Sequence, residues 1–219
     1  ETRHLRDVLR LHIGETVSVF NGKGAEFECA IESISSRSAD LKIIGKIEPP
    51  APESPLGLSL AAAVLKGDKF DLVVQKSVEL GAMNLIPIIS NRSDVKPRDA
   101  ARRLDRWRRI ALEASKQCGR ACLMSIEDIV DLNDFFHSAE KYGEILFFSE
   151  RAGQGLTESI ESEKLCAIIG PEGGWDDSEI EAAKSSKAEI ITLSGRVLRA
   201  ETASIAVAAI LQHRFGDLK

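Results

Sequence analysis

The stretch IITLSGRVLRAETASIAVAAIL, residues 190–211, joins two apolar runs through a polar loop that contains one glycine. The first run belongs to EIITLS, residues 189–194, which has the β-branched residues typical of a strand. The second, residues 205–211, has small side chains without Gly or Pro and favours a buried helix. A polar loop between a strand and a helix is a common place for chemistry in α/β proteins.

The same alternation of short apolar runs and longer helical segments extends back along the chain. The expected strands are LSLAAAV, LIPIIS, EILFFS and LCAIIG, beginning at residues 58, 85, 144 and 165. Between them, residues 68–80 and 99–118 have helical patterns, and Gly81 follows the first of these as a helix C′ residue would. The pattern predicts an α/β layer architecture with a largely parallel sheet.

The N-terminal quarter of the chain has a different pattern. ETVSVFN, AEFECAIESI and SADLKIIGKIE read as three strands of a small β-barrel, separated by turn signals at residues 21–24 and 35–36. EPPAPESP, residues 48–55, follows with four prolines, which suit a stiff, extended connection. We therefore expect a β-barrel domain over residues 1–49, a Pro-rich linker over 50–55 and an α/β domain over 56–219.

Composition excludes several classes of protein. The 219 residues carry a formal net charge of −5 and an ordinary proportion of apolar residues. The sequence contains neither an apolar run long enough to span a membrane nor the pattern of a signal peptide. We therefore expect a cytoplasmic protein without a membrane partner.

The cysteines and histidines give little sign of a metal site. Cys118 and Cys122 are four residues apart, but neither a second pair nor a nearby histidine completes a zinc-binding pattern. The four histidines lack the His-Glu-x-x-His pattern of metalloproteases. We expect reduced thiols and no bound metal.

Positive charge is concentrated in one segment in spite of the acidic total. Between residues 92 and 120 there are ten Lys or Arg residues and four Asp or Glu residues, so the local excess is ten minus four, or six. A solvated helix face is the simpler explanation. A second basic cluster at Arg3, Arg6 and Arg10 favours a phosphate-binding surface instead.

A second glycine-bearing loop, IIGPEGGWDDSE at residues 168–179, follows another expected strand. It lacks both Gly-x-Gly-x-x-Gly and a Walker sequence, which makes a familiar nucleotide loop improbable. Asp176 and Glu179 have the spacing of a helix capping box. A tight strand-to-helix turn is one explanation of the glycines, and close approach of a flat ligand to the backbone is another. For Arg199 and Glu201, an ion pair at the start of a helix is the alternative to a role in ligand binding. Thr202 is a candidate for the helix cap.

Several ordered motifs resemble one known family. GPEGGW with the following DSE, LSGRVLRAETAS, VVQKSVELGAMNLIPI, RWRRIALEASKQCGR and RHLRDVLRLHIGETVSVFNGKG are similar to the signature segments of the RsmE family. These are the 16S ribosomal RNA uridine N3-methyltransferases of the SPOUT superfamily. The resemblance covers nearly the whole chain. It implies a PUA-like N-terminal β-barrel, a SPOUT-type domain with a deep trefoil knot, and a homodimer.

The resemblance also implies a pocket for S-adenosylmethionine built from three loops. Glycines there permit close backbone approach, and leucines contact the adenine. The cofactor-binding residues carried over are Phe148, Ser149, Glu150, Ile169, Gly170, Pro171, Glu172, Gly173, Gly174, Leu193, Gly195, Val197, Leu198, Arg199, Thr202 and Ala203.

Transfer of a methyl group to uracil N3 requires alignment and removal of a proton. Arg199 is the candidate for holding the imide oxygens or a phosphate, and Glu201 and Glu172 are both candidate proton acceptors. A carboxylate that orients an arginine is an equally open role for either of them. By resemblance, the residues expected to contact 16S ribosomal RNA within the small subunit are Arg3, Arg6, Arg10, Lys76, Arg92 and Arg120.

Two further classes of function stay open from the residues. One is a non-catalytic RNA-binding or ribosome-assembly protein that retains the fold, against which the intact glycine loops speak. The other is an α/β enzyme that binds another nucleotide, which the absence of the familiar phosphate-binding motifs makes improbable.

Overall fold

The computed structural model describes residue 2 and residues 4–156, 158–160, 162–193 and 195–219. The chain forms two compact units. The first comprises Glu1–Glu53 with Ser115–Leu123, and the second comprises Ser54–Ala114 with Met124–Lys219. No helix among the described residues has the length and apolar character needed to cross a bilayer.

The first unit is built on a three-stranded antiparallel sheet of order β1-β2-β3. The strands are β1 (Thr16–Phe20), β2 (Glu26–Ile34) and β3 (Ala39–Ile47), preceded by the single-turn π-helix η1 (His4–Val8). Asn21 fixes the β1–β2 turn, because its side-chain oxygen accepts from the backbone amides of Lys23 (2.8 Å) and Ala25 (3.2 Å). Gly22 and Lys23 also form isolated bridges to Cys122.

The second unit contains a parallel sheet of order β10-β8-β9-β4-β5-β6, with β7 paired to β5. Its strands are β4 (Gly57–Ala63), β5 (Asn84–Ile89), β6 (Ser125–Ile126), β7 (Val130–Asp131), β8 (Glu144–Phe148), β9 (Lys164–Ile169) and β10 (Glu189–Ile191). Central strands β4 and β9 are almost wholly buried, as expected where helices cover both faces of a sheet. The predicted parallel α/β architecture and its five main strands are confirmed.

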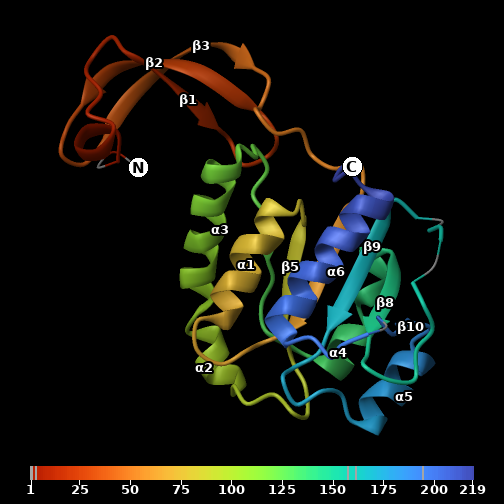
Figure 1. Ribbon diagram of the computed structural model, residues 1–219. Coiled ribbons are helices and arrows are strands. Elements are labelled where there is room, and N and C mark those ends of the chain that lie inside the picture. The colour runs from red at the N-terminus through yellow and green to blue at the C-terminus, as the bar shows by residue number, and fades with distance from the viewer. Residues whose placement is uncertain (1, 3, 157, 161, 194) are drawn as a thin grey trace. The chain divides into compact units, whose positions relative to one another are not determined.

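Helices cover the two faces of this sheet (Figure 1). On one face α1 (Lys69–Glu79) and α6 (Ala200–Phe215) pack together, and α6 contacts β4 and β9. On the other face a core cluster joins the strands to α4 (Leu132–Phe136), η2 (Ala139–Tyr142) and α5 (Asp177–Ser185).

The expected helix over residues 99–118 is divided in two. α2 (Pro97–Ala101) and α3 (Leu104–Cys118) are separated by a turn at Arg102 and Arg103. The Arg103 guanidinium donates to the carbonyls of Leu65 (3.3 Å) and Gly67 (3.1 Å). This tertiary contact holds the β4–α1 loop, and nothing in the local sequence signals it because neither Gly nor Pro marks the break.

Candidate active site

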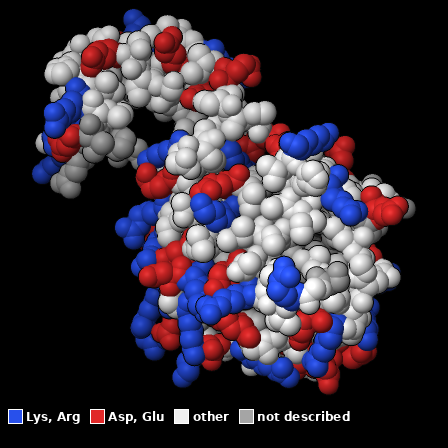
Figure 2. Space-filling model, in the orientation of Figure 1, with Lys and Arg blue, Asp and Glu red and all other residues white. Residues whose placement is uncertain are grey.

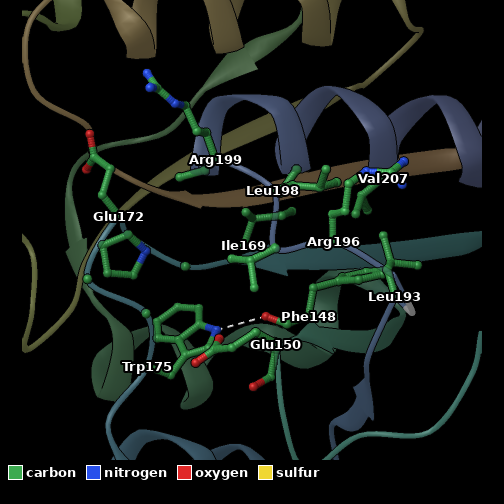
Figure 3. A pocket seen from close by; sticks show the side chains of 18 of the residues that line it. Phe148, Glu150, Ile169, Glu172, Trp175, Leu193, Arg196, Leu198, Arg199 and Val207 are labelled. Carbon is green, nitrogen blue, oxygen red and sulfur yellow. Dashed lines mark hydrogen bonds between the residues drawn. The ribbon is translucent and has the colours of Figure 1, made fainter.

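A cavity of about 580 Å³ opens at the carboxyl ends of three neighbouring strands, a volume within the range of small-molecule sites. Strands β8, β9 and β10 end at Phe148, Ile169 and Ile191, and the loops that follow them supply most of the wall (Figure 3). The described residues that line it are Lys69, Phe148, Ser149, Glu150, Ile169, Gly170, Pro171, Glu172, Gly173, Gly174, Trp175, Leu193, Gly195, Arg196, Val197, Leu198, Arg199, Ala200, Ala203 and Val207.

Trp175 supports the floor of this cavity. It is fully buried, its ring centroid lies 4.5 Å from that of Phe147, and its Nε1–H donates to the Phe148 carbonyl at 2.8 Å. A Cβ on Gly170 would lie 2.8 Å from the Trp175 ring. Gly170 is therefore required by packing against Trp175, whereas the sequence suggested room for a ligand there.

Gly195 has the geometry expected of a glycine beside a ligand. Its φ is +104°, which disfavours other residues, and a Cβ there would meet no described heavy atom within 4 Å. Gly173 differs, because its Cβ would lie 3.1 Å from the Arg92 Cβ. Of these two loop glycines, Gly195 is the one that borders open space in the cavity wall.

A buried carboxylate anchors the Gly170–Gly174 loop to the next helix. The predicted capping box is confirmed: Asp176 accepts from the Glu179 amide at 3.0 Å, and Glu179 accepts from the Asp176 amide at 3.0 Å. Glu179 also accepts from the backbone amide of Asn91 (2.8 Å). The loop after β5 is thus tied to the wall of the cavity.

The hydrogen bonds on Asp176 shift its titration. The Ser178 hydroxyl (2.6 Å) and the side-chain amide of Asn91 (2.7 Å) both donate to the Asp176 carboxylate. These hydrogen bonds, with that of Ser178 having the largest effect, lower the pKa of Asp176 from 3.8 to about 2. Because the folded-state pKa is depressed, this network stabilises the folded protein above pH 3.8. The contribution is lost as the pH falls through about 2.

Glu179→Ala is expected to lower the free energy of unfolding by about 2–3 kcal/mol, because two backbone amides lose their acceptor. Chemical denaturation of the variant measures this loss. Glu181→Ala on the same helix is the control, since Glu181 makes an exposed ion pair with Lys184 and should change stability by less than about 0.5 kcal/mol. Equal losses for the two variants would contradict the anchoring role.

Ionisable side chains gather at one end of the cavity. Lys69 Nζ donates to Glu172 Oε1 at 2.9 Å, and Arg199 is the N-cap residue of α6. Figure 3 shows Glu172 and Arg199 at the end of the cavity opposite Leu193 and Val207. The cavity therefore has a charged end at Glu172 and Arg199 and a more apolar end at Leu193 and Val207, where Arg196 also lies.

Most residues expected to contact a cofactor come together in this cavity. Two of the expected site residues, Thr202 and Glu201, stand outside the lining that the described residues form. α6 begins at Ala200, so Thr202 is its third residue, is exposed and is not the helix cap. Sequence reasoning missed the lining residues Lys69, Trp175, Arg196, Ala200 and Val207. Of these, Trp175, Arg196 and Ala200 stand inside motifs already recognised, whereas Lys69 is brought in by tertiary structure from a distant segment.

Family models match both parts of the chain. Residues 52–212 match an RNA methyltransferase domain, and residues 1–44 match the PUA domain of RNA methyltransferases. Ribosomal RNA small subunit methyltransferase E of Bacillus subtilis is 30% identical over 221 residues, covering 94% of this chain and 84% of the relative. The chain belongs to this methyltransferase E family. The resemblance seen in the sequence is confirmed.

Solved structures agree in fold and carry a ligand. A ribosomal RNA small subunit methyltransferase E from Neisseria gonorrhoeae, bound to S-adenosylmethionine, is 32% identical with a TM-score of 0.90, covering 100% of this chain and 90% of that chain. A Legionella pneumophila methyltransferase structure, in complex with the same bound cofactor, is 33% identical with a TM-score of 0.90 over 99% and 90% of the two chains. The antiparallel PUA domain and the parallel SPOUT-type domain are confirmed, and the trefoil knot stays a prediction.

The residues expected to contact RNA differ in how they are engaged. Arg3 lies outside the described residues, Arg10 is exposed, and Arg6 pairs with its neighbour Asp7. Arg92 is exposed and donates through Nη1 to the carbonyl of Gly173, a residue of the cavity wall, at 3.1 Å.

Two other expected RNA contacts are paired within the protein. Lys76 binds Glu79 at 2.8 Å, and the largely buried Arg120 donates through Nε to Glu53 at 3.1 Å. Arg120 holds two segments of the first unit together and is not presented to a phosphate. The sequence shows its charge but not its partner.

The basic segment is also interspersed with acids, as Figure 2 shows over the second unit. Arg102, Arg106 and Arg108 each lie within 4 Å of an aspartate carboxylate. The local charge excess therefore reflects in part a solvated, ion-paired helix surface, the simpler of the two explanations.

Cysteines and acidic residues form no candidate metal centre in the described part of the chain. The four cysteines are free thiols, and complete burial raises the pKa of Cys166 to about 12. No cysteine stands among the described residues that line the cavity, and its charged end is formed by the side chains of Lys69, Glu172 and Arg199.

Proposed function

We propose that this chain is an S-adenosylmethionine-dependent methyltransferase that methylates N3 of one uridine in 16S ribosomal RNA of the small subunit. The observation that carries the proposal is the cavity at the ends of β8, β9 and β10, with its open glycine, apolar end and charged end. Membership of the methyltransferase E family supports the reaction, and the Neisseria relative's bound cofactor supports the ligand.

The residues of the cavity fit this cofactor. Phe148, Ile169 and Leu193 provide an apolar wall suited to a purine, while Gly195 leaves the backbone open to close approach. Leu198, 38% exposed, and Val207 extend the same wall. We assign the adenosine to this apolar end.

When bound, S-adenosylmethionine would supply an electrophilic methyl group. A bond forms between uracil N3 and the methyl carbon as the carbon–sulfur bond breaks, and the sulfonium becomes a neutral thioether. The chain's own residues must therefore orient the uracil and deal with the N3 proton. The exposed guanidinium of Arg199 is suited to the two imide oxygens, where negative charge develops. A carboxylate at the same end accepts the proton.

The uridine must be unpaired or turned out of its stack, because N3 is engaged in a base pair. Arg6 and Arg10 in the first unit and Arg92 in the second are exposed, which suits phosphate contacts that position RNA without specifying sequence. We omit Arg120, which is buried against Glu53, and Lys76, which is only partly exposed and pairs with Glu79. Selection of one uridine then depends on the folded shape of the RNA.

A homodimer in the cytoplasm, where ribosomal RNA is found, is part of the proposal. Val197 is 84% exposed beside the cavity, and Ile205 and Ile210 on α6 are partly exposed. Apolar side chains in such positions are suited to a subunit interface. Sedimentation analysis should give the mass of two chains.

Methyl transfer to isolated ribosomal subunits tests the proposal. With labelled S-adenosylmethionine, we expect label in small subunits from a strain that lacks the enzyme. Large subunits, and small subunits that already carry the modification, are the controls and should stay unlabelled. Cofactor binding without transfer to any subunit would support a non-catalytic RNA-binding role instead.

A further inference from the structure

Lys69 reaches the cavity from outside the three loops that form most of its wall. It is the first residue of α1, placed there by the β4–α1 connection that Arg103 holds. Its Nζ lies 2.9 Å from Glu172 Oε1, and both side chains are partly exposed, 39% and 27%. A cation is thus fixed directly on a carboxylate that lines the cavity.

A second carboxylate, that of Glu201, contributes to the charge around the same ammonium. Glu201 follows Arg199 and Ala200 in the first turn of α6, outside the described cavity lining. Its Oε2 is buried and has no hydrogen-bond partner among the described residues. A buried carboxylate oxygen without a donor is costly unless a nearby cation offsets its charge. Lys69 is positioned to provide that charge.

Electrostatics support this grouping. The pKa of Lys69 is raised, first by its hydrogen bond to Glu172 and then by the charges of Glu172 and Glu201, while Arg199 opposes the shift. The charged groups that face Lys69 are thus Glu172 from the loop after β9, and Arg199 and Glu201 from the start of α6. The ammonium keeps its proton at any pH at which the enzyme works.

The two candidate proton acceptors therefore differ in access. A general base must come within hydrogen-bond distance of the proton that it removes. Glu172 lines the cavity at the same end as Arg199 and is open to a base bound there. Glu201 is outside that lining, and its Oε2 is buried.

We propose that Glu172 is the group that accepts the uracil N3 proton, that Lys69 is its positioning residue, and that Glu201 serves to hold Lys69. The inference rests on the proposed function. The proton passes from N3 to a carboxylate oxygen of Glu172, which becomes a neutral acid. Lys69 holds that carboxylate through the 2.9 Å ion pair before the base enters. Its ammonium also adds positive charge at the end of the cavity where the imide charge would develop.

Four substitutions separate these roles in the methyl-transfer assay. Glu172→Gln should lower kcat at least about 100-fold, within the range of a lost general base, while Glu201→Gln should stay within about tenfold of wild type. Lys69→Met should lower kcat about tenfold while the affinity for S-adenosylmethionine stays within several-fold of wild type, because the carboxylate loses the group that positions it. Lys69→Arg should restore kcat.

The control is Lys184→Met on α5, which removes a Lys–Glu ion pair of comparable length, with Glu181, from an exposed helix surface. It should leave kcat and cofactor affinity at wild-type values. The proposal is overturned if Glu201→Gln costs as much as Glu172→Gln. It is also overturned if Lys69→Met lowers cofactor affinity as much as kcat, or if Lys69→Arg fails to restore kcat, since a merely structural role would give those results.

A measurement on the free protein keeps this test separate from the proposed function. The Lys69 side chain, followed by NMR, should titrate above an ordinary lysine. Its midpoint should fall more in Glu172→Gln than in Glu201→Gln. That result together with no RNA methylation would reject the function but keep the charge cluster. A midpoint that neither substitution moves would reject the cluster itself.

Discussion

Gly195→Val is expected to reduce the affinity for S-adenosylmethionine at least about 100-fold, or about 2.7 kcal/mol of binding free energy. The valine side chain would project from a backbone with φ of +104° into space that borders the cavity and holds no described atom within 4 Å. Because that space is open, the fold accommodates the side chain, whereas a ligand against the backbone does not. Isothermal titration calorimetry measures the change.

Gly14→Val is the control for backbone strain. Gly14 has a similar φ of +92°, and a Cβ there would again meet no described heavy atom within 4 Å, but this glycine lies in the first unit. Both variants should lose about 1–3 kcal/mol of stability from the positive φ. Gly14→Val should retain wild-type cofactor affinity. Wild-type affinity in Gly195→Val would show that the cofactor does not approach this loop.

Arg199→Ala is expected to lower kcat about 100- to 1,000-fold, the range seen when a group that stabilises developing charge is removed. Its affinity for S-adenosylmethionine should stay within several-fold of wild type. Arg199 stands at the charged end of the cavity with Glu172, away from the apolar wall assigned to the adenosine. Single-turnover transfer and equilibrium binding separate the two effects.

Arg214→Ala provides the matched control, because Arg214 is exposed in the last turn of the same helix. It should leave both cofactor affinity and kcat unchanged. An equal loss of cofactor affinity and activity in Arg199→Ala would assign Arg199 to the cofactor and not to the target base.

The architecture of the second unit could be predicted from short-range patterns. LCAIIG and LSLAAAV are continuous apolar runs because strands β9 and β4 are buried on both faces. The Asp176 and Glu179 capping box is likewise local, since all its partners lie within one turn. The break between α2 and α3 could not be foreseen, because contacts of Arg103 with residues 65 and 67 accompany it.

The site was predicted where its motifs are contiguous and missed where it depends on long-range contacts. Gly195 and Leu198 stand in a recognisable loop, and the structure places both in the cavity wall. Lys69 meets Glu172 across 103 residues of sequence, and no local pattern reports such a pair. The sequence also left Glu172 and Glu201 as equal candidates, because burial distinguishes them and charge does not.

The identity of the methylated nucleoside tests the central claim most directly. Small subunits from a strain lacking the enzyme would be incubated with the protein and S-adenosylmethionine, and the RNA digested and analysed by mass spectrometry against nucleoside standards. The account predicts 3-methyluridine, present with wild-type protein and strongly reduced with Arg199→Ala. Formation of 5-methyluridine or a 2′-O-methylated nucleoside in its place would contradict the account, because a different atom would then be the nucleophile.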